Sequence, residues 1–342
     1  MTTSVPAVET FRLGPHIASR IWTGLWQLSS PEWGTAKVSK IREAMARHVA
    51  MGYNGFDMAD HYGSAEVLFG EFYRSSPYAE QIVAGTKWCV FKTVDPTRDV
   101  VFSAICERME RMKTRRVDLL QFHWQDYSDN RYLMALHHLA DLKDEGYISA
   151  LGLCNFDAIR TDEICTELGP GVVVSNQIQF SLIDTRALHG MSDVCQKHGL
   201  KLLTYGTLCG GFLSDKWLGK PEPQQYGGYD QTPSTRKYLD MIVKAWGSWD
   251  LFQTLLQVLR QIGDRHGRSI SNIAMRWVLD HPFVGAVLIG ARLGVSEHVD
   301  DNRLASGFRL TKHDLTSIDS VLDRSRGRTM IASIGDCGAE YR

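Results

Sequence analysis

A strand, a helix and a second strand follow one another near the middle of the sequence. Positions 118–122 read DLLQF, positions 131–145 repeat apolar residues with the period of a helix, and positions 148–153 read ISALGL. Gly146 stands where a left-handed residue can end the helix. Such a segment is typical of a βαβ unit, whose two strands run parallel. The sequence here predicts an α/β fold.

The same unit recurs along the chain. Eight short apolar runs are predicted as strands, at 21–26, 54–58, 82–87, 118–122, 148–153, 172–177, 201–205 and 286–290. Segments of helical period accompany them, at 38–51, 97–113, 131–145, 157–168, 185–198, 251–266, 270–281 and 311–323. Eight strands joined by crossover helices predict a single-domain (β/α)8 TIM barrel over residues 1–342.

An open doubly wound sheet is the alternative architecture. Such a sheet favours a G-x-G-x-x-G turn after its first strand, and no such turn follows Trp26. Two segments fall outside the repeat. Residues 215–234, rich in Pro, Gly and Gln, are predicted as a long loop after the seventh strand, and residues 324–342 form a C-terminal tail that either folds over the barrel mouth or is disordered.

Composition narrows the class of protein. The chain has 342 residues, a net charge of -1 and no basic runs, which disfavours a nucleic-acid or membrane surface and favours a small-molecule substrate. Neither a signal peptide nor a long uncharged apolar stretch is present, so a cytoplasmic protein is expected. Seven scattered cysteines without a C-x-x-C pair predict no disulfide framework and no structural metal. The oligomeric state stays open.

Four chemically distinct side chains follow neighbouring predicted strands. Asp57 lies near the end of the second strand and Tyr62 follows it, Lys87 ends the third, and His123 follows the fourth. Active-site groups of a (β/α)8 barrel lie at these carboxyl ends. Tyr62 is predicted to donate a proton to a carbonyl oxygen as the carbon receives hydride, with no metal required. Lys87 is expected to lower the pKa of Tyr62, Asp57 to hold Lys87, and His123 to orient the substrate oxygen.

These residues also resemble the pattern of a known protein family. Residues 55–66, with Lys87 and His123, resemble the signature of the aldo-keto reductases, as do TGLW at 23–26, LGLCNF at 151–156, and Asn176-Gln177. The resemblance implies a (β/α)8 barrel with extended NADPH across its mouth, NADH being less favoured. Cys154 stands where the family commonly has Ser, and Gly206-Thr207 where it commonly has Ser-Pro.

The resemblance also implies a set of cofactor-binding residues. Asn155 and Gln177 would hold the carboxamide, Tyr205 would stack under the nicotinamide, and Arg292 would meet the 2′-phosphate. The full implied set is Gly24, Leu25, Asp57, Cys154, Asn155, Gln177, Tyr205, Gly206, Thr207, Leu208, Gly210, Gly290, Arg292, His298, Asp301 and Asn302.

The substrate is expected to meet an aromatic mouth that suits a sugar or an aryl carbonyl. Two other functions compete with reduction. One is a metal-dependent barrel hydrolase built on Asp60, His61 and His123. The other is a non-catalytic NADPH-binding regulatory subunit on the same fold. The residues predicted to contact substrate are Trp26, Tyr62, Trp88, His123 and Trp124, with Trp33 nearby.

Overall fold

Eight parallel strands close into a barrel in the computed structural model, which describes residues 6–224 and 232–342. The strand order is β10-β3-β4-β5-β6-β7-β8-β9, and pairing of β10 with β3 closes the ring. The predicted TIM barrel is confirmed, and each predicted strand is present. The strands are β3 (Ile21–Gly24), β4 (Gly55–Asp57), β5 (Val83–Val90), β6 (Val117–Trp124), β7 (Ile148–Cys154), β8 (Val173–Gln179), β9 (Lys201–Tyr205) and β10 (Val284–Gly290).

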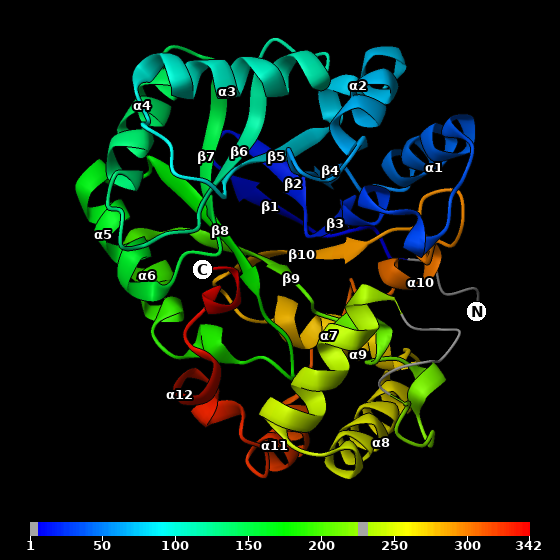
Figure 1. The fold of residues 1–342 in the computed structure, drawn as a ribbon. Helices are drawn as coiled ribbons and strands as arrows, with labels where there is room; N and C mark the ends of the chain where they lie inside the picture. The colour runs from blue at the N-terminus through cyan, green and yellow to red at the C-terminus, as the bar shows by residue number, and fades with distance from the viewer. Residues whose placement is uncertain (1–5, 225–231) are drawn as a thin grey trace.

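Helices surround the strands (Figure 1). They are α1 (Val38–Ala50), α2 (Ala65–Ser75), α3 (Arg98–Arg111), α4 (Tyr132–Asp144), α5 (Ala158–Leu168), α6 (Met191–His198), α7 (Pro233–Asp240), α8 (Trp249–His266), α9 (Ile270–Leu279), α10 (Val299–Arg303), α11 (Lys312–Leu322) and α12 (Met330–Ile334). None of the helices in the described residues is long and apolar enough to cross a membrane. The expected cytoplasmic location stays a prediction.

Two helical segments differ from the sequence prediction, and glycine explains both. The predicted helix 185–198 is split, because Gly190 adopts a φ of 99° between a 3-10 turn (Arg186–Leu188) and α6. Helix α2 was not predicted, and Gly70 interrupts its apolar pattern. A Cβ at Gly70 would lie 2.6 Å from the Arg111 carbonyl oxygen, so the glycine allows α2 to pack closely on the end of α3.

A hairpin of β1 (Thr10–Leu13) and β2 (His16–Ser19) precedes the barrel and was not predicted either. Leu13 and Ala18 belong to the core cluster inside the barrel, together with Trp22 and Leu203. Phe11 lies directly against Gly285 of β10. The hairpin therefore closes the end of the barrel where the strands begin, and the site has to be sought where they end.

The described parts of the two irregular segments lie around that second end. In the predicted loop 215–234, residues 225–231 lie outside the described part, α7 begins within it at Pro233, and a 3-10 turn (Asp215–Trp217) packs on α8. The C-terminal tail takes the first of its two predicted forms and folds over the mouth. Its end lies near the middle of the barrel in Figure 1, where Arg342 donates a hydrogen bond to the backbone oxygen of Asn155 at 3.2 Å.

Gly55→Ala should destabilise the barrel. A Cβ there would lie 2.4 Å from the ring of the buried Trp22, and overpacking a rigid core costs roughly 1–3 kcal/mol. Gly24→Ala is the matched control in the adjacent strand, because its Cβ would find ordinary contacts from 3.5 Å outward. Thermal unfolding of both variants measures the difference, and an equal midpoint for the two would contradict the packing argument.

Candidate active site

A buried ion pair lies at the centre of the candidate site. Lys87 of β5 donates to Oδ2 of Asp57 at the end of β4 over 2.7 Å, and to the backbone oxygen of Met58 over 2.8 Å. Both charged side chains are almost fully buried. The ammonium of Lys87 also lies 4.9 Å from the centre of the Tyr62 ring. Three of the four predicted catalytic residues are thus brought together.

Two glutamines complete the environment of the Asp57 carboxylate. Oδ1 of Asp57 accepts from the amide nitrogens of Gln121 at 2.8 Å and Gln177 at 2.7 Å, and Gln177 also donates to the amide oxygen of Gln121. Gln177 was expected to hold the carboxamide of the cofactor. Its side-chain nitrogen already donates to Asp57 and Gln121, so only its side-chain oxygen could contact that carboxamide. The sequence analysis did not identify Gln121 as a site residue. The sequence does contain a signal for it, because this glutamine interrupts the apolar run DLLQF and lies on the same strand face as His123.

Lys87 lowers the pKa of Tyr62 as expected, but burial outweighs this effect. Burial raises the pKa of Tyr62 above its ordinary value; the charge of Lys87 opposes that shift without overcoming it, although part of the residue stays exposed. Burial also works to lower the pKa of Lys87, but Asp57 and Tyr62 outweigh it and leave that pKa raised. At neutral pH the site therefore holds a protonated phenol beside a fixed ammonium.

His123 is held in one tautomer by its neighbour. Its Nδ1 lies 3.1 Å from the backbone oxygen of Cys154, and because a carbonyl can only accept, the proton is on Nδ1. Burial lowers the pKa of His123 to about 4, so the imidazole is neutral at pH 7. Nε2 is buried with no hydrogen-bond partner among the described residues. In this state Nε2 is an acceptor, suited to an alcohol hydroxyl rather than to a carbonyl oxygen.

The residues expected at the nicotinamide lie together across the mouth. Asn155 follows β7 with a left-handed φ of 61°, and its side-chain oxygen accepts from the hydroxyl of Tyr205 at 2.8 Å. Cys154 is buried, and burial raises the pKa of its thiol to about 12, so it does not act as a nucleophile. Tyr341 of the tail meets the Tyr205 ring edge-on at 6.3 Å. An amide and an aromatic face converge here, as a nicotinamide carboxamide requires.

The segment after β9 is a tight turn covered by a helix. Gly206 and Gly210 both have positive φ, and a Cβ at Gly206 would lie 2.3 Å from the hydroxyl of Tyr238 in α7. Thr207 is buried, and its hydroxyl lies 3.3 Å from the backbone oxygen of Phe180, while Leu208 is partly buried. Only glycine permits this close approach of α7 to the turn.

The remaining residues implied for the cofactor lie on the adjacent rim. Gly24 ends β3 and Leu25 follows it, and the Leu25 N–H donates to the Asp57 backbone oxygen at 2.9 Å. Gly290 ends β10, and the exposed Arg292 follows it.

The residues near α10 that the family resemblance implies for cofactor binding differ in their surroundings. His298, which precedes α10, is exposed. Asp301 instead serves the fold, because its carboxylate accepts from Ser269 at the start of α9 at 3.2 Å. The Asn302 N–H donates to the His298 backbone oxygen.

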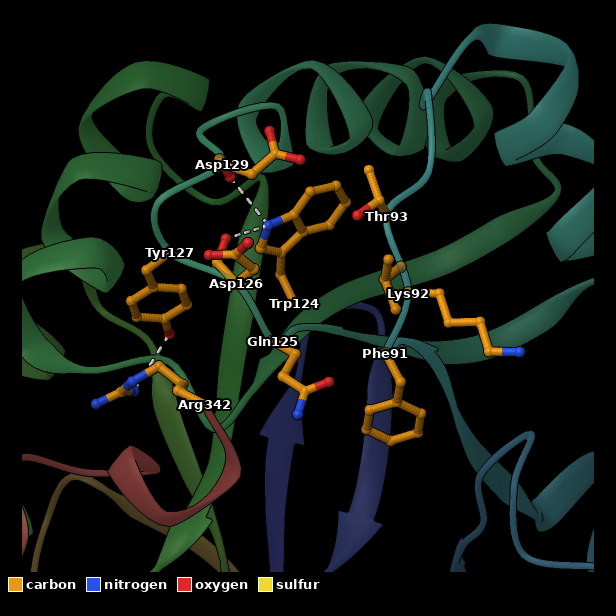
Figure 2. A pocket seen from close by; sticks show the side chains of 10 residues that line it. Phe91, Lys92, Thr93, Trp124, Gln125, Asp126, Tyr127, Asp129 and Arg342 are labelled. Carbon is orange, nitrogen blue, oxygen red and sulfur yellow. Dashed lines mark hydrogen bonds between the residues drawn. The ribbon is translucent and has the colours of Figure 1, made fainter.

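A cavity of about 440 Å³ lies between the segments that follow β5 and β6 (Figure 2). Phe91 lines it, is half exposed, and packs against the His123 ring at 5.6 Å, yet the sequence did not single it out. Trp124, which was predicted to contact substrate, also lines it, with its indole nitrogen donating to the backbone oxygens of Asp126 and Asp129. The lining residues are Val90, Phe91, Lys92, Thr93, Trp124, Gln125, Asp126, Tyr127, Asp129 and Arg342.

The other predicted substrate residues lie elsewhere. Trp26 is 38% exposed and packs on Trp33 at 4.8 Å, at the end of β3. Trp88 is buried on Phe122 in the core shared with helix α3. Because successive side chains of a strand alternate, the inward direction of Lys87 sends Trp88 outward to the helices. Trp88 therefore packs mainly in the core, and its predicted contact with substrate stays a prediction.

The fold and the site define a barrel enzyme whose chemistry lies at the carboxyl ends of the strands. Residues 20–323 match the model of the Aldo/keto reductase family, and the chain belongs to that family. The aldo-keto reductase YhdN of Bacillus subtilis is 25% identical over 90% of this chain and 91% of its own. The chloroplastic pyridoxal reductase of Arabidopsis thaliana is 24% identical over 95% and 89%.

Solved structures agree on the fold. The glycerol dehydrogenase of Gluconobacter oxydans superposes with a TM-score of 0.75 at 24% identity, covering 92% of this chain and 95% of that one. A holo aldo-keto reductase from Bacillus halodurans gives a TM-score of 0.70 at 22% identity, covering 92% and 96%. The family membership and the reductase relatives, rather than the fold alone, establish an NAD(P)H-dependent oxidoreductase that acts on carbonyl compounds.

Gln121→Leu should impair turnover through Asp57. The substitution removes one hydrogen bond to a buried carboxylate, a loss of about 1.5–3 kcal/mol, and kcat should fall by roughly tenfold or more. Because Asp57 raises the pKa of Lys87, a displaced Asp57 should also move the alkaline limb of the kcat profile to lower pH. The pH dependence of kcat measures both effects.

The matched control is Gln257→Leu, at an exposed position of α8. It should leave both kcat and the alkaline limb in place. A Gln121→Leu enzyme that loses stability but keeps the wild-type pH profile would show that Gln121 only fills space.

Proposed function

We propose that the protein is an NADPH-dependent reductase that converts an aldehyde or ketone into an alcohol, reversibly, with Tyr62 as the proton donor. The observation that carries this proposal is the ammonium of Lys87, fixed by Asp57 and placed 4.9 Å from the Tyr62 ring, at the mouth of the barrel. A proton donor beside a fixed positive charge is what carbonyl reduction needs, since negative charge develops on the oxygen.

The proton transfer follows from the protonation states of the site. A bound nicotinamide cofactor would supply the hydride to the carbonyl carbon. The Tyr62 hydroxyl donates to the carbonyl oxygen, and its raised pKa keeps the proton in place until that oxygen becomes strongly basic. Lys87 then stabilises the phenolate left on Tyr62. Asp57 and the two glutamines hold Lys87 throughout, since both charges are buried and satisfied.

His123 contributes on the alcohol side. Its Nδ1–H is engaged by the Cys154 carbonyl, so Nε2 can accept the hydrogen of the alcohol but cannot donate to a carbonyl unless the ring is protonated. With a pKa of about 4 the ring stays neutral over the physiological range. In reduction the carbonyl oxygen thus depends on Tyr62 for its donor, and His123 holds the hydroxyl once it has formed.

Substrate class follows from the cavity and from the relatives. The cavity combines the rings of Phe91, Trp124 and Tyr127 with polar side chains, which suits an aryl carbonyl or a sugar. The relatives include a pyridoxal reductase and a methylglyoxal reductase, whose names point to small aldehydes. The complete catalytic arrangement favours this reading over a non-catalytic regulatory subunit.

Tyr62→Phe should abolish most turnover while NADPH still binds. Loss of a positioned general acid lowers rates by about 10²–10⁴-fold, and the phenyl ring preserves the shape of the site. Tyr73→Phe, a partly buried tyrosine of α2 stacked on Phe69, is the matched control and should keep the wild-type rate. Stopped-flow NADPH oxidation with an aldehyde panel, beside fluorescence titration of NADPH, separates turnover from binding. Reduction at nearly the wild-type rate by Tyr62→Phe would exclude Tyr62 as the acid.

Arg292→Gln should weaken NADPH binding and leave NADH binding unchanged. Arg292 is exposed directly after β10, and a charged hydrogen bond to a 2′-phosphate contributes about 1.5–3 kcal/mol, or roughly 10–100-fold in Kd. Arg74→Gln, at an exposed position of α2, is the control. Titrations with both cofactors decide the point, and an equal loss for NADH would mean that Arg292 does not contact the 2′-phosphate.

A further inference from the structure

Three potential metal ligands of different chemistry meet beside Tyr62. Asp60 and His61 precede Tyr62 in the loop after β4, and Cys89 stands two residues beyond Lys87 in β5. One ligand atom from each lies within 4.8 Å of the other two. Among the described residues, this is the group whose geometry suits an ion, and it contains Cys89 where the sequence-based hydrolase alternative had His123.

The carboxylate of Asp60 is already fixed for this role. Its Oδ2 accepts from the guanidinium of Arg108 at 2.5 Å and from the Cys89 N–H at 2.9 Å. The second oxygen, Oδ1, faces Nδ1 of His61 at 3.1 Å. One oxygen therefore anchors the side chain, while the other is directed at the space shared with His61 and Cys89. Neighbours that hold a ligand in this way are typical of metal sites in proteins.

The imidazole of His61 is accessible and held by aromatic contacts. Its side chain is 43% exposed. The ring meets Tyr62 edge-on at 4.8 Å and Phe91 edge-on at 5.1 Å. An ion from solvent can reach it, and the imidazole can turn to shorten the remaining gap. Cys89 is one of two partly exposed cysteines in the described chain, the other being Cys106.

We propose that Asp60, His61 and Cys89 bind one thiophilic divalent cation of the Zn²⁺ type at the mouth of the barrel. The reason is the donor set, because carboxylate, imidazole and thiolate together select Zn²⁺ over Mg²⁺ or Ca²⁺. Bonds of about 2.0–2.3 Å would draw the three groups closer than they now lie, and water would take the fourth position. Binding releases the Cys89 thiol proton and replaces the hydrogen bond between Asp60 and His61, with no change of redox state.

Occupancy should inhibit reduction. His61 and Phe91 flank Tyr62 and His123, so an ion that pulls the loop toward β5 displaces the proton donor and narrows the entrance. This consequence rests on the proposed function, whereas binding of the ion does not. The cluster is thus an inhibitory site for the metal ion next to the catalytic residues, and catalysis itself needs no ion there.

Cadmium titration tests the site directly, because a Cd²⁺–thiolate bond absorbs in the ultraviolet. The metal-free wild-type protein should bind one Cd²⁺ per chain with a thiolate band, and Cys89→Ser should lose the band. Asp60→Asn and His61→Ala should weaken binding by tenfold or more while Cys89 stays intact, which covers the case in which Cys89→Ser fails to fold. Cys106→Ser, the matched control in α3, should keep the band.

Zn²⁺ inhibition of carbonyl reduction provides the second measurement. Cys89→Ser should raise the half-inhibitory Zn²⁺ concentration by at least tenfold relative to Cys106→Ser. A wild-type protein without a stoichiometric band, or a band that survives in Cys89→Ser, overturns the site. A band that depends on Cys89 in a protein that reduces no carbonyl would uphold the site and refute the proposed function instead.

Discussion

The buried ion pair between Lys87 and Asp57 is the interaction on which the active site depends. Removing two charges from water carries a penalty of several kcal/mol for each ion, and mutual attraction offsets it only when the remaining polar atoms are also satisfied. Here Met58 accepts from the ammonium, and Gln121 and Gln177 donate to the carboxylate. The pair is therefore held by groups from β4, β5, β6 and β8. The charges can take these positions only when the barrel has brought these strands together.

The barrel ends are unequal, and this directs the chemistry to one side. The hairpin of β1 and β2 fills the end where the strands begin with apolar side chains, while the opposite end carries the ion pair and His123. Charges that are buried yet near an opening interact strongly with an entering group, since little water screens them. A neutral phenol beside a fixed ammonium in that position would stabilise negative charge that forms on an entering group.

Much of this could be predicted from the sequence, because strand period and strand ends are local signals. Asp57, Lys87 and His123 were placed by the rule that barrel chemistry sits at carboxyl ends; the structure joins Lys87 to Asp57 and ties His123 to the Cys154 carbonyl of the next strand. Trp88, next to Lys87, points outward instead and packs on Phe122. The tautomer of His123 could not be predicted, since it depends on a backbone carbonyl that only the pairing of neighbouring strands brings near.

Asn155 shows why the C-terminal tail belongs to the site. Its left-handed φ of 61° is strained for most residues, and asparagine is among the few that tolerate it. Three elements hold it there: its N–H donates to Gln177 of β8, its side chain accepts from Tyr205 of β9, and its backbone oxygen accepts from Arg342 of the tail. The tail is itself anchored by the buried Arg186, which binds Glu340 at 3.0 Å. Because one strained residue links all three elements, the position of the tail and the position of the Asn155 amide cannot vary independently.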